Sequence, residues 1–227
     1  MCYWVLSALL AEQGLRTLMI NLEQAERGGL NSYIKKEGKS GLSDLLIEDR
    51  PLAELLFPVR KNLYYLPGGD LLKADRYIAT EMATPNALLE TAMNKQQHAF
   101  DVIIIDCAGN SKSHLAMNAF YWADAMLVAV GLREKGMDAL GDFMDRQLPL
   151  MINRMRQSVG KEPIQIVNII PNWHDRRTSG SSKQLEKLKK RHRELVSEPL
   201  TKVEAIEWAW KAKGAQNNKL DTSSAVG

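Results

Sequence analysis

The feature that most constrains the fold is a repeated alternation of short apolar runs with segments of helical spacing. Residues 102–105 (VIII) are four consecutive β-branched apolar residues followed by Asp106, the pattern of a strand covered on both faces. Further strands are predicted at 16–22, 62–66, 125–130 and 164–170. Strands that alternate with helices along a chain favour a parallel sheet rather than an all-β fold.

Between these runs, apolar residues recur at helical spacing. Helices are predicted at 2–12, 42–48, 51–56, 85–96, 115–121, 138–156, 183–195 and 202–213. The sequence therefore predicts an α/β fold, with a mainly parallel twisted sheet, helices on both faces and right-handed crossovers. In such folds ligands bind beyond the carboxyl ends of the strands.

Length and composition narrow the class of protein. The 227 residues favour one domain, predicted over 1–214 and followed by a polar tail, 215–227. The net charge of +3 permits an anionic partner without requiring one. Two cysteines, Cys2 and Cys107, form no disulfide framework, and the apolar runs are far shorter than a membrane span. We expect a soluble protein of the reducing cytoplasm.

Two acidic residues follow predicted strands. Asp106 stands where nucleotide hydrolases hold a Mg²⁺-bound water, although an aspartate that caps the next helix would look the same. Glu23 follows the strand at 16–22 and could orient an attacking water, or it could be a solvated loop residue. Gly28 and Gly29 could form an anion-binding turn, but no G-x-x-x-x-G-K-[ST] motif occurs in the sequence.

The order of several motifs resembles the ParA/MinD family of deviant Walker ATPases. The matching segments are ALLAEQGLRTLMINLEQ, NLYYLPGG, FDVIIIDCAGN, MNAFYWADAMLVAV and VNIIPNWHDRRT. The resemblance extends from about Val5 to about Gly214 and implies a P-loop NTPase fold that uses ATP and Mg²⁺. It makes Asp106 the Walker B aspartate and metal ligand. Glu23 takes the place of the hydrolysis-linked aspartate, and Pro171 and Asn172 lie where the family builds its adenine pocket.

The chain departs from the family pattern at four places. The family's first strand and its phosphate-binding loop, KGGVGKT[TS], have no counterpart here, since Met1 falls almost where that loop should end. Asn21 stands where the family has the first aspartate of the Walker A′ strand, and Glu23 stands where it has the second. The family's Asp-Cys-Pro-Pro has become residues 106–109 (DCAG). Because positioned phosphate donors account for most of phosphoryl-transfer catalysis, these residues alone are not expected to hydrolyse ATP.

The resemblance also places the absent strand at the centre of the sheet. Its two neighbours should then present unpaired edges buried in the core. Two explanations stay open. Either residues upstream of Met1 belong to the protein in the cell, or the chain is a diverged paralogue that closes the gap by rearranging strands or by pairing with a second chain.

A basic cluster marks the predicted helix at 183–195. Lys183, Lys187, Lys190 and Arg191 fall on one helical face, and Arg177 lies just upstream. Such a face would contact DNA phosphates without sequence preference, or it could be an ordinary solvated surface.

Together these features favour a ParA-like partition protein for plasmid or chromosome segregation. The resemblance implies a homodimer, a ParB-like adaptor, non-specific DNA as a partner and a place on the nucleoid. The alternative is a non-catalytic pseudo-ATPase, without a P-loop, that binds DNA or a partner as a regulator. A MinD-like membrane-targeted protein fits less well, since residues 217–227 lack the pattern of an interfacial helix, and we expect no membrane partner.

Overall fold

The computed structural model describes residues 2–22, 40–80, 88–94, 99–107, 113–172 and 179–199. These residues form two compact units, one within Met1–Ala119 and the other within Phe120–Val203. No helix among them is long and apolar enough to cross a membrane. The predictions for Glu23, Arg177, the helix at 202–213 and the tail at 215–227 lie outside the described residues.

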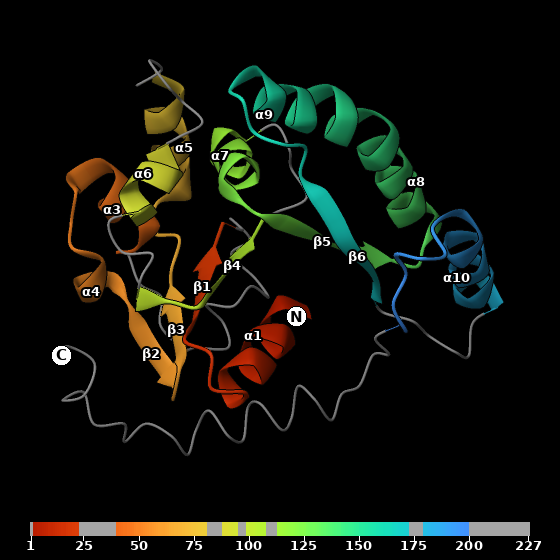
Figure 1. Ribbon diagram of the computed structural model, residues 1–227, viewed down its shortest axis with the longest axis horizontal. Helices are drawn as coiled ribbons and strands as arrows, with labels where there is room; N and C mark the ends of the chain where they lie inside the picture. Colours follow the sequence, from red (N-terminus) through yellow and green to blue (C-terminus); the bar gives the residue numbers. More distant parts are fainter. Residues whose placement is uncertain are drawn as a thin grey trace. The chain divides into compact units, whose positions relative to one another are not determined.

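The first unit is built on a four-stranded sheet in the order β2-β3-β1-β4 (Figure 1). Its strands are β1 (Thr17–Asn21), β2 (Phe57–Arg60), β3 (Leu63–Leu66) and β4 (Val102–Asp106). β1 is the central strand and pairs in parallel with both β3 and β4, whereas β2 is antiparallel at the edge. The predicted parallel α/β class is therefore confirmed. β2 was not predicted because it contains Pro58. Proline has no N–H to donate to a neighbouring strand, so within sheets it is found mainly in edge strands such as β2.

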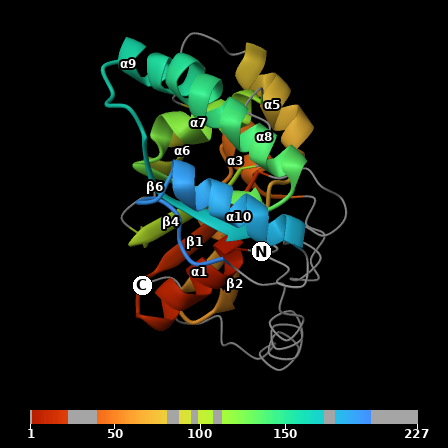
Figure 2. The same ribbon diagram turned by 90° about the vertical axis from the view of Figure 1, so that its right-hand side faces the viewer.

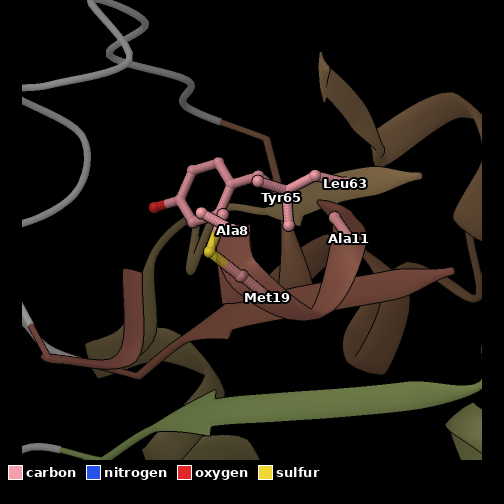
Figure 3. Close-up of a cluster of buried hydrophobic side chains, with 5 residues drawn as sticks. All are labelled: Ala8, Ala11, Met19, Leu63 and Tyr65. Atoms are coloured by element: carbon pink, nitrogen blue, oxygen red, sulfur yellow. The ribbon is translucent and has the colours of Figure 1, made fainter. Parts of the chain in front are cut away.

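Helices cover both faces of this sheet (Figures 1 and 2). On one face α1 (Cys2–Glu12) places Ala8 and Ala11 against Met19, Leu63 and Tyr65 (Figure 3). The opposite side carries α3 (Leu42–Glu48), α4 (Leu52–Leu55), α5 (Leu71–Thr80) and α6 (Leu88–Asn94). Leu18 and Ile20 of β1 are almost fully buried, so the core follows the central strand. The sequence analysis did not predict α5.

The missed helix α5 supplies a residue that holds the start of α7 (His114–Trp122). Asp75 accepts hydrogen bonds from the hydroxyl of Ser113 (2.7 Å) and from the backbone N–H of Leu115 (2.9 Å). Nδ1 of His114 lies 3.6 Å from its other carboxylate oxygen. Partial burial acts to raise the pKa of Asp75, but these bonds outweigh it, so the pKa lies below its ordinary value. The ionised carboxylate is thus the form that the fold stabilises.

Replacing Asp75 by asparagine should therefore lower stability in a pH-dependent way. A carboxyl pKa lowered on folding gives stability that is present above the unfolded value of about 4 and lost as the pH falls through the folded value. We expect a loss of about 1 kcal/mol at pH 7 that shrinks as the pH falls through the folded pKa, measured by urea unfolding from neutral to acidic pH. Asp138→Asn, an exposed site on another helix, is the control; a loss independent of pH would contradict the assignment.

The second unit contains two parallel strands, β5 (Ala125–Gly131) and β6 (Gln165–Asn172). One face of this pair is covered by α8 (Glu134–Asp142) and α10 (Ser179–Arg191), which lie beside it in both views (Figures 1 and 2). The buried cluster between them consists of Val130, Leu132, Leu140, Ile169 and Leu188. Both predicted strands of this unit are thus present.

The predicted helix at 138–156 lies within a longer helical stretch. α8 continues into a π-helical segment, η2 (Phe143–Asn153), and then into α9 (Arg154–Ser158). η2 contains Pro149, which cannot donate an intrahelical hydrogen bond. The basic helix also has different bounds from those predicted: α10 ends at Arg191 and begins at Ser179.

Four strands are paired on one side only within the described residues, namely β2, β4, β5 and β6. β4 pairs with β1 alone, and β5 pairs with β6 alone. Every residue of β4 is half-buried, whereas every residue of β1 is buried. Within the described residues β4 therefore has one unpaired edge, and its residues are half-buried rather than buried in the core.

Candidate functional site

Polar side chains meet at the carboxyl ends of two neighbouring parallel strands, β1 and β4. Asn21, the last residue of β1, is in register with Asp106, the last residue of β4. The chain then leaves β1 through Leu22, whose N–H donates to the carbonyl of Asp106 at 2.9 Å. The sheet thus brings together the aspartate predicted from the sequence and the asparagine that replaces a family aspartate. This is the position at which parallel α/β folds bind ligands.

Tyr65 of β3 joins this pair from the other side of β1. It is 1% exposed, and its side chain is hydrogen-bonded to that of Asn21, which is 3% exposed. Burial raises the pKa of Tyr65, the bond to Asn21 acts in the opposite direction, and the negative charge of Asp106 adds to the rise. Tyr65 therefore stays protonated at neutral pH. The sequence analysis placed it in a strand but assigned it no role in the site.

Cys107 follows Asp106 directly. Burial, together with the neighbouring negative charge of Asp106, raises the pKa of its thiol to about 12. A thiol with so high a pKa is almost entirely protonated at neutral pH and is a weak nucleophile.

The residues of this site suit a magnesium ion better than a transition metal. Mg²⁺ prefers oxygen ligands and usually takes one or two carboxylates, completing its shell with water and substrate phosphates. Asp106 offers a carboxylate and Asn21 a carboxamide oxygen at adjoining strand ends. Among the described residues there is no group of three or more His, Cys, Asp or Glu side chains placed to hold a metal ion, so waters would complete the shell of a cation bound here.

The other predicted ligand-binding residues lie in the second unit. Pro171 and Asn172 close β6, in register with Val130 and Gly131 of β5. Pro171 is buried and Asn172 is half-buried. They stand at the carboxyl end of their own strand pair, the location expected of a ligand-binding edge.

The predicted basic face is present on α10. Lys183, Lys187 and Lys190 are exposed and, being four and three residues apart, they share one side of the helix. The opposite side buries Ser181 and Leu188. This arrangement leaves a row of ammonium groups facing away from the buried cluster.

Two further cations of α10 have partners within the unit. Arg191 forms an ion pair with Asp145 of η2 at 2.7 Å, and Lys189 forms one with Glu198 at 3.2 Å. Arg191 was predicted to belong to the basic face, but its charge is largely balanced by Asp145. The three lysines make no ion pair with other described residues, so they carry the net positive charge of this surface.

A mainly parallel sheet flanked by helices, with an aspartate at the end of an apolar strand, is the architecture of P-loop nucleotide hydrolases. The chain belongs to the ParA/MinD-type branch of these ATPases, and residues 3–160 match a family model described as an AAA domain.

Solved structures share the fold at low sequence identity. The chain is similar to an ATP complex of a McdA variant from Cyanothece (TM-score 0.73, 19% identity, 92% of this chain and 80% of that one). It is similar to cobyrinic acid a,c-diamide synthase from Mycobacterium smegmatis with an ATP analogue and magnesium (TM-score 0.71, 21% identity, 92% of this chain and 84% of that one). It is also similar to a plasmid partition protein from Borrelia burgdorferi, with a TM-score of 0.67 and 18% identity over 92% of this chain and 88% of that one. No curated protein matches the chain in sequence.

Proposed function

We propose that the protein is a ParA-type partition protein that binds DNA without sequence preference through α10. The observation that carries this proposal is the row of exposed lysines, Lys183, Lys187 and Lys190, opposite the buried side of the helix. A run of lysines on a rigid element contacts successive phosphates and releases counterions, which requires no base readout. The similarity to a plasmid partition protein supports the same role. Arg177, just before this helix, would add a further phosphate contact.

Reversing two of these charges should abolish most of the DNA affinity. We expect Lys187→Glu combined with Lys190→Glu to weaken binding to a random duplex about tenfold or more in a mobility-shift assay at low salt. For the unmutated protein, log K should fall with log salt at a slope of about −3 if three lysines contact phosphates.

The matched control for this experiment is Lys61→Glu combined with Lys135→Glu, which changes the net charge equally at two exposed positions elsewhere. It should retain most of the affinity. No shift of DNA by the unmutated protein at low salt would exclude the DNA-binding role.

The second part of the proposal concerns the nucleotide. Mg²⁺ would be held by Asp106 and oriented with the help of Asn21, and Glu23 would stand where the family places its hydrolysis-linked carboxylate. Pro171 and Asn172 would contact the adenine. When bound, Mg²⁺ would neutralise charge on the phosphates. The residues of this chain do not include a phosphate-binding motif that would hold those phosphates.

We therefore expect the 227-residue chain to show no ATP turnover above background and weak or absent binding of Mg·ATP. The lost backbone donors and lysine are what the reaction chiefly requires, and removal of one such donor alone typically costs about 10²–10³ in rate. Phosphate release measures ATP turnover, and calorimetry measures the binding of Mg·ATP. The Asp106→Asn variant gives the background for both. Micromolar affinity for Mg·ATP would prove this expectation wrong.

The proposal includes a homodimer and a ParB-like adaptor as partners, and a place in the cytoplasm at the nucleoid. A second candidate function is a non-catalytic regulator that binds DNA or a partner without using ATP. The observation that favours it is Asn21, whose neutral side chain replaces an acidic one directly beside Asp106. DNA binding that is indifferent to Mg·ATP would support the regulator, whereas DNA binding that requires Mg·ATP would support the partition ATPase.

A further inference from the structure

The buried phenol of Tyr65 lies close to the residues of the proposed metal site. A protonated phenol is not among the oxygen ligands that Mg²⁺ usually takes. In the sheet, Met19 of β1 pairs with Tyr65, and Asn21 of β1 pairs with Asp106. Met19 and Asn21 are two residues apart, so their side chains leave the same face of the sheet. Tyr65 and Asp106 consequently lie on that face as well, one on each side of β1.

The direction of the tyrosine side chain explains how it reaches Asn21. Two residues of a strand span about 6.6 Å, a distance that a tyrosine side chain can cover. The ring packs beside Met19 and Ala8, and its hydroxyl lies at the end of the cluster away from Ala11 and Leu63 (Figure 3). There it is hydrogen-bonded to the side chain of Asn21. Apolar packing thus aims the hydroxyl at the carboxamide.

We propose that Tyr65 is a positioning residue, whose hydroxyl holds the carboxamide of Asn21 in the orientation that lets its oxygen share a divalent cation with Asp106. This inference rests on the metal site proposed above. A carboxamide can rotate to offer either oxygen or nitrogen, and only the oxygen binds a hard cation. When the carboxamide N–H donates to the phenol oxygen of Tyr65, the carboxamide oxygen is left free for the cation, and such outer partners typically change metal affinity about tenfold or more.

The test uses Mn²⁺ alone as the probe, titrated into the full chain while the amide and carboxamide NMR signals are recorded. In the unmutated protein, Mn²⁺ should broaden the signals of Asn21 and Asp106. Tyr65→Phe keeps the ring and removes only the hydroxyl, so it should shift the Asn21 carboxamide signals and weaken Mn²⁺ binding about tenfold. The control is Tyr64→Phe, on the opposite face of β3 and edge-on to Phe100, which should change neither.

A double variant separates positioning from general stability. If Tyr65 acts through Asn21, adding Tyr65→Phe to Asn21→Ala should cause no further loss of Mn²⁺ affinity. Unchanged Mn²⁺ affinity in Tyr65→Phe, or an equal further loss in the Asn21→Ala background, would overturn the positioning role while leaving the metal site intact. Absence of Mn²⁺ binding in the unmutated protein would instead overturn the metal site, and the role of Tyr65 with it.

Discussion

Replacing Arg156 by methionine is expected to lower the free energy of unfolding by about 3–5 kcal/mol. Arg156 is buried in the second unit, and its guanidinium donates to four backbone carbonyls. Nη1 bonds the carbonyls of Phe120 (2.8 Å), Tyr121 (2.8 Å) and Ala123 (3.0 Å), and Nε bonds that of Glu162 (2.7 Å). Methionine fills a similar volume but offers these carbonyls no hydrogen-bond donor.

Three of these carbonyls, those of Phe120, Tyr121 and Ala123, lie at the C-terminal end of α7 and just beyond it. The last carbonyls of a helix have no intrahelical partner and carry partial negative charge. A cation beside them therefore donates hydrogen bonds to these carbonyls and also interacts favourably with the helix dipole. Lys161 adds a second cation, 3.3 Å from the carbonyl of Tyr121 and 4.0 Å from the centre of its ring. Arg156 therefore fixes the turn between α7 and β5 from the distant helix α9.

Urea unfolding followed by circular dichroism measures the loss, and hydrogen exchange should show that β5 and β6 lose protection. Arg154→Met, exposed on the same helix, is the matched control and should change stability by less than about 0.5 kcal/mol. Arg156→Lys should fall between the two, because an ammonium cannot serve all four acceptors. Stability within 1 kcal/mol of the unmutated protein in Arg156→Met would mean that water replaces the guanidinium.

The second large effect is expected in the first unit, at Gly41. This residue precedes α3 and lies against the loop that follows β3, where Leu42 N–H donates to the carbonyl of Pro67 (2.8 Å) and Ser43 N–H to that of Gly68 (3.1 Å). A Cβ on Gly41 would overlap the carbonyl of Pro67, standing 2.7 Å from its carbon and 2.8 Å from the nitrogen of Gly69. These are backbone atoms, which cannot turn aside as a side chain can.

Gly41→Ala should therefore separate α3 from this loop and cost about 3 kcal/mol. The cost is steric, since the φ of Gly41 is 175°, an extended value open to any residue. Gly14→Ala is the complementary control: its φ is +90° with no atom near the added Cβ, so it should cost only about 1 kcal/mol. Urea unfolding measures both losses. Equal losses in the two variants would show that the backbone moves away from the added Cβ at Gly41 with little cost in free energy.

Much of the fold could be predicted because its signals are local. The run 102–105 reads as a buried strand from four consecutive β-branched residues, and Asp106 at its end follows from the same short segment. β2 and α5 were missed for different reasons. Pro58 is atypical of a strand and hides the edge strand β2. In α5 the buried residues Leu71, Ala74 and Ile78 do have helical spacing, so that helix could have been predicted from the sequence.

The candidate site could be predicted only in part. The sequence analysis found Asp106 and noted Asn21, but did not identify Tyr65 as their neighbour. One signal was present: strand alternation puts Tyr65 and Tyr64 on opposite faces, so one of them had to point toward the face of Asn21. Choosing between them requires the register of β3 against β1, which depends on packing along the whole sheet.

By itself, then, the sequence determined the alternation of strands and helices, the aspartate at a strand end and the lysine row of α10. These follow from spacing within a few residues, where periodicity and side-chain chemistry suffice. Only the tertiary structure decided that Asn21 lies between Tyr65 and Asp106, that Asp145 balances Arg191 and that Arg156 binds carbonyls more than thirty residues away. Such contacts join distant segments, and their free energy depends on geometry that no local pattern encodes.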